Sequence, residues 1–141
     1  MEVRPVREAA ELAQALRLRE RVFCDEQGVS PGAERDGLDG DAFHLVAVEG
    51  GRVVGTCRLV FARDAAFLGR LAVEADARRR GVGAALLGEA AEQAAAAGAR
   101  RIGLHAQLEV RELYSSAGYI ELGEPFVEEG IDHITMEKAL A

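Results

Sequence analysis

The chain has 141 residues, of which 49% are hydrophobic and 29% charged, and its formal net charge is -7. This composition predicts one ordinary globular domain spanning residues 1–141 and argues against sequence-independent nucleic-acid binding, which needs a broad basic face. No stretch has the apolar length of a membrane span and the first residues lack a secretion signal, so we expect a cytoplasmic protein without a membrane partner.

The N-terminal third predicts one strand, one helix and one long loop. Val3–Val6 is a short strand, and Glu8–Val22 has helical periodicity. Asp25–Asp41 loses that periodicity and is rich in glycine and acidic residues, which indicates a loop; loops of this length inside compact domains are usually functional. The apolar stripe expected on the helix consists of Ala9, Leu12, Ala13 and Leu16.

The middle of the chain predicts an antiparallel meander followed by a helix. Phe43–Glu49 and Arg52–Phe61 are joined by a glycine pair typical of a tight hairpin, and Ala66–Glu74 is the third strand. From Arg80 to Ala97 the apolar period becomes helical, and a glycine follows as a stop signal.

The last third predicts three strands and one short helix. The strand Arg101–Gln107 follows a helix that follows Phe67–Val73, so these two strands should be parallel neighbours. The pattern therefore favours an α+β class: a central mixed, mostly antiparallel, twisted sheet flanked by helices. The remaining elements are Val110–Ala117, Tyr119–Leu122 and Ile131–Glu137.

The most informative segment is Arg78-Arg79-Arg80-Gly81-Val82-Gly83-Ala84, between a strand and a long helix. The first N–H groups of a helix are unpaired and carry partial positive charge, so they bind anions. Gly81 and Gly83 let a phosphate approach the backbone. The segment lacks the Gly-Lys-Ser/Thr of a nucleotide P-loop, and Leu86 stands where a dinucleotide-binding fold needs its third glycine.

Arg78-x-x-Gly81-x-Gly83 after Leu71-Ala72-Val73 resembles the pyrophosphate-binding signature of the GNAT (Gcn5-related N-acetyltransferase) superfamily. The element order over the whole chain is similar to that acyl-CoA N-acyltransferase fold, and Tyr114-x-x-x-Gly118-Tyr119 resembles a later family segment. Arg19 to Phe23, Glu26 to Val29 and His105-Ala106-Gln107 resemble the small bacterial subgroup that includes the ElaA and YjcF proteins.

The resemblance implies an acetyl-CoA site, with CoA as product and no metal. The main chain of Leu71 and Val73 would pair with the pantetheine arm, and the N–H of Leu71 would donate to the thioester carbonyl. Gln107, seven residues before Tyr114, stands where many relatives carry a cofactor-contacting Asn. Arg78 opens the signature, and the N–H groups implied to hold the pyrophosphate are those of Arg79, Gly81, Val82, Gly83 and Ala84.

The resemblance also implies that Tyr114 protonates the departing thiolate as a general acid. By spacing alone Tyr114 reads as a core aromatic residue, four positions after Val110. An attacking amine must lose a proton, and the sequence leaves the base open among Glu26, His44, His105, His133 and bulk water. Cys24 and Cys57 are far apart without metal-ligand spacing, so we interpret both as small hydrophobic residues.

The acidic loop predicts a pocket for a cationic acceptor, with Glu26, Asp36 and Asp39 as binding residues; its alternative role is a solvated face. Three later acidic residues could contribute to this pocket: Glu128, Glu129 and Asp132. The favoured function is transfer of acetyl from acetyl-CoA to a primary amine by direct attack. The alternatives are an acetyl-CoA or CoA-binding module without turnover, and an interaction protein that binds no CoA. The acceptor, a small molecule or peptide, is not determined by the sequence, and a homodimer is compatible with it.

Overall fold

The computed structural model describes residues 1–140, which form a seven-stranded sheet with strand order β1-β2-β3-β4-β5-β7-β6. Only β4 and β5 are parallel, and every other neighbouring pair is antiparallel. This confirms the mixed, mostly antiparallel sheet and the parallel crossover. The strands are β1 (Glu2–Pro5), β2 (Phe43–Glu49), β3 (Arg52–Ala62), β4 (Ala65–Val73), β5 (Arg101–Gln107), β6 (Ile120–Glu128) and β7 (Ile131–Ala139).

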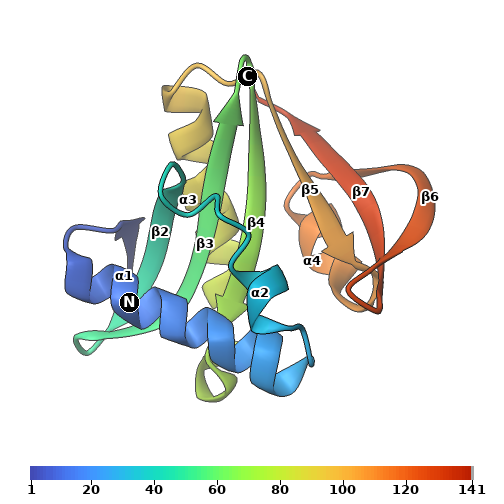
Figure 1. Ribbon diagram of the computed structural model, residues 1–141. Coiled ribbons are helices and arrows are strands. Elements are labelled where there is room, and N and C mark those ends of the chain that lie inside the picture. Colours follow the sequence, from blue (N-terminus) through green and yellow to red (C-terminus); the bar gives the residue numbers. More distant parts are fainter. Residues whose placement is uncertain (141) are drawn as a thin grey trace.

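Helices cover both faces of the sheet (Figure 1). The helix α1 crosses one face of β2, β3 and β4, and α3 packs on the other face of the same strands. The helix α4 lies beside β5. The helices are α1 (Ala9–Arg19), α2 (Pro31–Glu34), α3 (Val82–Ala96) and α4 (Arg111–Ser116), with a π-helical segment η1 (Glu20–Glu26) and two 3₁₀ turns, Ala75–Ala77 and Leu108–Val110.

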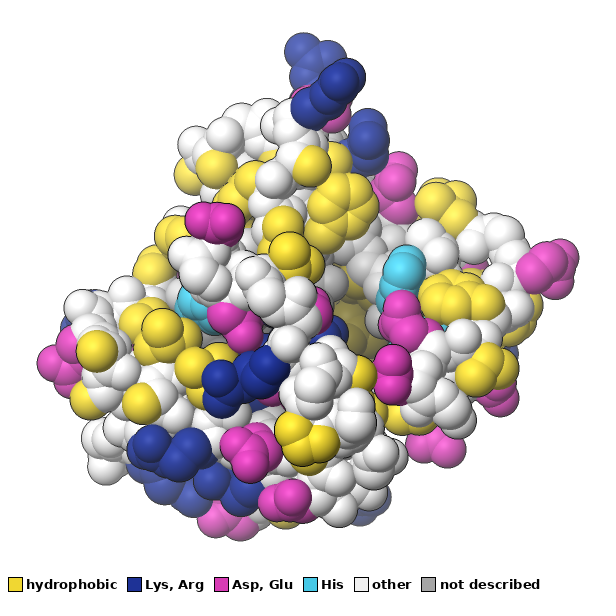
Figure 2. Space-filling view, viewed as in Figure 1, with side chains coloured by type: hydrophobic (Ala, Val, Ile, Leu, Met, Phe, Trp, Pro, Cys, Tyr) yellow, Lys and Arg dark blue, Asp and Glu magenta, His cyan; other side chains and the backbone are white. Residues whose placement is uncertain are grey.

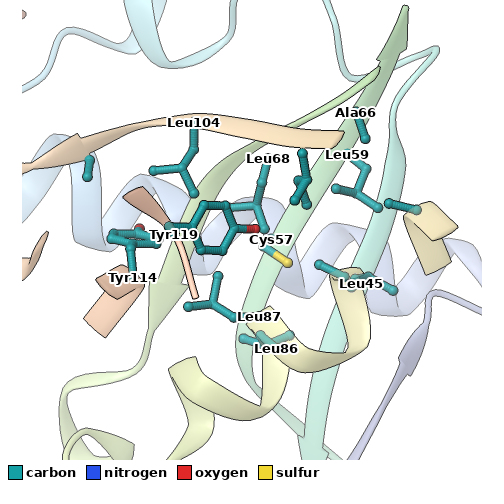
Figure 3. Close-up of a cluster of buried hydrophobic side chains, with 14 of the residues drawn as sticks. Leu45, Cys57, Leu59, Ala66, Leu68, Leu86, Leu87, Leu104, Tyr114 and Tyr119 are labelled. Atoms are coloured by element: carbon teal, nitrogen blue, oxygen red, sulfur yellow. The ribbon is translucent and has the colours of Figure 1, made fainter. Parts of the chain in front are cut away.

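The main core lies between α3 and the sheet (Figure 3). Alanines and leucines of α3 pack on β3 and β4 because small side chains allow a close approach. At Gly55 of β3 an added Cβ would lie 2.7 Å from Cγ1 of Val82 and 3.0 Å from Cδ1 of Leu86. Gly55 therefore sets how closely the start of α3 approaches the sheet.

The strands β4 and β5 separate soon after they pair. Their ladder covers Ala65 to Phe67 opposite Arg101 to Gly103 only, and beyond it the strands diverge (Figure 1). On the other edge of β4 the register shifts, so that Arg70 and Leu71 together lie opposite one β3 residue, and Arg70 has φ 56°. This bulge and the divergence leave the second half of β4 open towards β5.

Two expectations about the N-terminal third are wrong in detail. The apolar stripe is rotated: Ala15, Leu18 and Val22 are the buried apolar residues of this helix, not the four residues expected. The segment after it is not a structureless loop, because η1 continues the helical backbone to Glu26 and α2 follows. The hydrophobic period misleads here because Arg19, which is 1% exposed, occupies a core position through ion pairs that no local pattern reveals.

The C-terminal elements extend beyond their predicted ends. The strands β6 and β7 run to Glu128 and Ala139, since they pair with each other along most of their length. Within residues 1–140 no helix combines the length and the apolar character that crossing a bilayer requires.

Candidate active site

A cavity of about 890 Å³ lies where β4 and β5 diverge. Figure 2 shows a hollow on this face of the molecule, with acidic and histidine side chains along one side and basic side chains along the other. The structure brings most of the predicted site residues to this cavity. Those lining it are Glu26, Leu71, Val73, Arg78, Arg79, Gly81, Val82, Gly83, Ala84, Gln107 and Tyr114.

The N-terminus of α3 forms one end of the cavity. Gly81 is its N-cap with φ 84°, and Arg79 has φ 64°. Because Gly81 has no side chain, it cannot cap the first turn as a serine or aspartate would, and the first N–H groups remain open to a ligand. The left-handed backbone at both positions turns the chain sharply into the helix. These are the features of an anion site that fits a pyrophosphate.

Arg78 links the two sides of the cavity. Its Nε donates to the Val73 carbonyl at 3.0 Å, and its Nη2 donates to Oε1 of Glu26 at 2.8 Å. Glu26 therefore lines the cavity with its carboxylate already paired to an arginine. Arg80, the third residue of the arginine run, pairs with Glu49 of β2 instead.

Tyr114 lies on α4 and faces both the cavity and the core. It is 7% exposed, and burial raises the pKa of its phenol above the ordinary value, with a smaller contribution from Cys57. The phenol therefore stays protonated at neutral pH, as a general acid requires. The Tyr119 ring packs against it edge-on, with centroids 6.1 Å apart (Figure 3).

Both cysteines behave as the sequence predicted. Cys57 is 1% exposed, and burial raises the pKa of its thiol to about 12. Cys24 is half-buried, and burial raises its pKa as well. At neutral pH both are protonated, so neither is activated as a nucleophile.

A second cavity of about 190 Å³ adjoins the first on the side of β7. Six residues line both cavities, and they mark the junction between them. Gln107, one of the six, donates to Oε1 of Gln27 at 2.9 Å and so bridges β5 to the segment after η1. The six are Phe23, Gln27, Arg70, Gln107, Glu128 and His133.

A cluster of two histidines and one carboxylate faces this junction. His105 of β5 contacts Oε1 of Glu128 through Nδ1 at 3.2 Å, and Nε2 of His133 lies 3.8 Å from Oε2 of the same carboxylate. The Phe126 ring stacks on His133 and packs edge-on against His105. In the sequence His105, His133 and Glu128 were separate candidates, and strand pairing brings the three side chains together.

The acidic loop is held by arginines. Asp36 accepts from Arg58 at 2.9 Å and from Arg70 at 3.2 Å, and Asp39 accepts from Arg19 at 2.7 Å and from Arg58 at 3.0 Å. Hydrogen bonds from Arg58 lower the pKa of Asp36, against the effect of burial. For Asp39, burial raises the pKa, but hydrogen bonds from Arg19 and Arg58 outweigh it and the net shift is downward.

Glu34 completes this network. Its side chain is 1% exposed, and it accepts from Arg19 at 2.6 Å and from Arg70 at 3.0 Å. Three arginines and three carboxylates thus form a cluster of zero formal charge, which we call the arginine–carboxylate network: Arg19, Arg58, Arg70, Glu34, Asp36 and Asp39.

The network changes the interpretation of two predicted acceptor residues. The expected role of Asp36 and Asp39 rested on carboxylates without internal partners, and the structure gives both of them arginine partners. No functional role was expected for Arg19, Arg58 or Arg70. The one available signal was that Arg58 and Arg70 are single arginines within otherwise apolar strands.

His44 lies apart from the cavity residues described above. It belongs to β2, and its Nε2 is 3.0 Å from the Asp39 carbonyl, to which it donates. This hydrogen bond ties the end of the acidic loop to the sheet, and it is a structural contact.

Comparison with known proteins gives the same family throughout. The family model of the acetyltransferase (GNAT) domain matches residues 8–140. The uncharacterized N-acetyltransferase YjcF of Bacillus subtilis is 33% identical over 91% of this chain and 92% of its own length.

Two solved structures are similar over nearly the whole chain. An acyl-CoA N-acyltransferase from Pseudomonas aeruginosa is 30% identical with a TM-score of 0.87, covering 99% of this chain and 100% of its own. ElaA of Escherichia coli is 27% identical with a TM-score of 0.86, covering 97% and 98%. The chain belongs to the GNAT acetyltransferase family.

Proposed function

We propose that this protein transfers an acetyl group from acetyl-CoA to a primary amine by direct attack of the amine on the thioester. The observation that carries the proposal is one continuous cavity that joins the open N-terminus of α3, the unpaired half of β4 and the buried Tyr114. The family membership agrees with this donor.

Each part of the cavity suits one part of acetyl-CoA. The N–H groups at the start of α3 suit the pyrophosphate, because they combine unpaired donors with the positive end of the helix dipole. The edge of β4 at Leu71 and Val73 faces the gap left by β5 and can pair with the amides of a pantetheine arm as an added strand would.

The chemistry at the far end of the cavity follows from three groups. The Leu71 N–H lies in the bulged part of β4 and suits the carbonyl oxygen on which negative charge grows. Tyr114 supplies the proton that the departing thiolate takes. Direct attack is favoured over an acyl-cysteine intermediate because Cys57 is buried and its pKa of about 12 keeps it a thiol.

The acceptor enters through the smaller cavity in this proposal. The charged residues in its lining are Glu34, Arg70, Glu128 and Glu129. Glu34 and Arg70 pair with each other within the arginine–carboxylate network, so the negative charges of Glu128 and Glu129 remain. A protonated amine is the natural counter-charge.

Two measurements test the function. A ligand that binds the native state at about one hundred times its dissociation constant adds roughly 2.7 kcal/mol of stability, so acetyl-CoA should raise the melting temperature while ATP and NAD should not. A turnover screen with polyamines, amino sugars, aminoglycosides, amino acids and lysine peptides should reveal an acetylated product. Equal thermal shifts with all three nucleotides would contradict the donor site, and acetyl-CoA binding without turnover on the whole panel would indicate a binding module.

A further inference from the structure

One ring nitrogen of His133 is free to take a proton at the junction of the two cavities. Its Nδ1 is 2.7 Å from the Ile131 carbonyl oxygen. A carbonyl oxygen only accepts, so Nδ1 must carry the hydrogen, and in the neutral ring Nε2 then carries the lone pair. The backbone of β7 thereby fixes the tautomer of this histidine.

The ring is also held in position. His133 is 7% exposed, Phe126 stacks on it at a centroid distance of 5.9 Å, and its strand neighbour on β5 is Gln107. It lines the cavity that contains Leu71 and Tyr114 as well as the smaller cavity on the acceptor side. A buried, oriented imidazole between the donor and acceptor sites has the geometry of a general base.

The carboxylate of Glu128 lies near Nε2, the free ring nitrogen of His133. Oε2 of Glu128 is 3.8 Å from Nε2 of His133, and Oε1 of Glu128 is 3.2 Å from Nδ1 of His105. The side chains of Glu128 and His105 are 47% and 52% exposed. A small rotation of Glu128 would close the longer distance. The protonated Glu128 would then donate to Nδ1 of His105, and Nε2–H of that ring would release a proton to solvent.

We propose that His133 is the general base of the reaction and that Glu128 and His105 form its proton exit to solvent. This rests on the proposed acetyl transfer. The bound ammonium group loses one proton to Nε2 of His133 and keeps the electron pair, which attacks the thioester carbon. As the C–S bond breaks, the thiolate receives the Tyr114 proton, and the second proton leaving the amine nitrogen restores that tyrosine.

The alternatives to His133 have less suitable surroundings. Glu26 is paired with Arg78, and His44 donates to a backbone carbonyl outside the junction. His105 is half exposed and hydrogen-bonded to Glu128, so it lies on the exit side of that carboxylate. The titratable and charged residues that line the two cavities with His133 include Glu128 on β6, His105 on β5, Arg70 on β4, Glu34 on α2, Glu26 on η1 and Glu129 in the β6–β7 turn.

The decisive variant is His133→Asn, because the asparagine amide can still donate to the Ile131 carbonyl while the basic nitrogen is lost. With the amine found by the screen, kcat should fall about 10²- to 10⁴-fold, the usual contribution of general-base catalysis. Acetyl-CoA affinity should stay the same. Wild-type kcat should rise with pH as the base loses its proton, and this ascending limb should disappear in the variant.

The matched control is His44→Gln, which removes an imidazole outside the junction and keeps a donor for the Asp39 carbonyl; it should retain the limb. Long-range ¹H–¹⁵N NMR of the free wild-type protein gives a second readout that needs no substrate, and it should show His133 protonated at Nδ1 only when neutral. An Nε2–H tautomer, or a His133→Asn enzyme that keeps both its rate and its ascending limb, would overturn His133 as the base and leave the proposed acetyl transfer unaffected. Absence of turnover by wild type on every amine would instead contradict the proposed function and the base with it.

Discussion

The proposed donor and acceptor halves of the cavity are built in different ways. The donor half is mainly backbone: the first turn of α3 and the open edge of β4, with glycines where a ligand must come close. The acceptor half is built from side chains, with histidines and carboxylates of β5, β6 and β7 beside a network of arginines and carboxylates. A main-chain site tolerates most side-chain changes and fails when bulk is added, whereas a side-chain site fails when one charge is removed.

The largest effect should come from adding bulk to the donor half. Gly83→Val should abolish acetyl-CoA binding, because a branched side chain would fill the space where phosphate approaches the helix. A Cβ added at Gly83 would lie 3.4 Å from Cδ2 of Leu113, so the methyl groups of valine would also press on α4. Isothermal titration measures the loss.

The control is Gly88→Val in the same helix. Gly88 is exposed and an added Cβ meets open space there, so this variant carries the same β-branched penalty away from the cavity. It should bind acetyl-CoA like wild type. Normal binding by Gly83→Val would place the phosphates elsewhere.

Tyr114→Phe tests the proposed general acid, which lines the larger cavity. Turnover should fall by about 10²- to 10⁴-fold with little change in acetyl-CoA affinity, because the ring stays and only the proton donor is lost. Single-turnover kinetics measure the chemical step.

Tyr119→Phe is the matched control. Within residues 1–140 the buried Tyr119 hydroxyl has no hydrogen-bond partner, so removing it should leave stability unchanged or slightly higher and the rate near that of wild type. If both variants had equal rates, Tyr114 would be a packing residue.

Glu34→Gln tests the network beneath the acceptor half. Arg19 and Glu34 are both 1% exposed, and breaking such a pair leaves a buried charge with fewer partners. We expect a loss of about 3 kcal/mol, the lower end of the range for buried pairs, because Asp39 still holds Arg19. Urea denaturation measures it.

The corresponding change at the exposed Arg80–Glu49 pair, Glu49→Gln, should barely move the urea midpoint, since solvent screens surface pairs. A similar small loss for Glu34→Gln would show that water reaches Arg19.

The smallest effect should be on the pH dependence of stability in acid. The pKa of Asp36 is lowered in the folded state, so its carboxylate stabilises the protein fully above the unfolded pKa of about 3.9, and this contribution disappears as the pH falls towards the folded value. Asp36→Asn should therefore be less stable than wild type at pH 6, with the difference shrinking near pH 3. A difference that does not depend on pH would argue against the Arg58 pairing.

The donor half could be predicted because its residues are local in sequence. Arg78 to Ala84 form the end of a turn and the start of one helix, and a helix start predicts its own anion site whatever surrounds it. The hairpin around Gly50 and Gly51 and the parallel crossover were predicted for the same reason, since they depend on turn chemistry and hydrophobic period.

The acceptor half could not be predicted in this way. Arg19 belongs to the predicted helix and Glu34 to the predicted loop, yet they lie together in the interior, where Arg70 from the bulge of β4 is a third partner. Likewise, the proposed role of His133 depends on its hydrogen bond to the carbonyl of Ile131, two residues earlier, and on the Glu128 carboxylate across the β6–β7 hairpin.

By itself, the sequence determined the family, the order of elements and the glycine-rich helix start at one end of the cavity, because short-range patterns encode helix starts, strands and tight turns. Only the tertiary structure decided which charges neutralise one another and which histidine stands free between the two cavities. Ion pairs and proton relays depend on side chains brought within a few ångströms by strand register, and Coulomb and hydrogen-bond energies at that range depend on placement rather than on residue type.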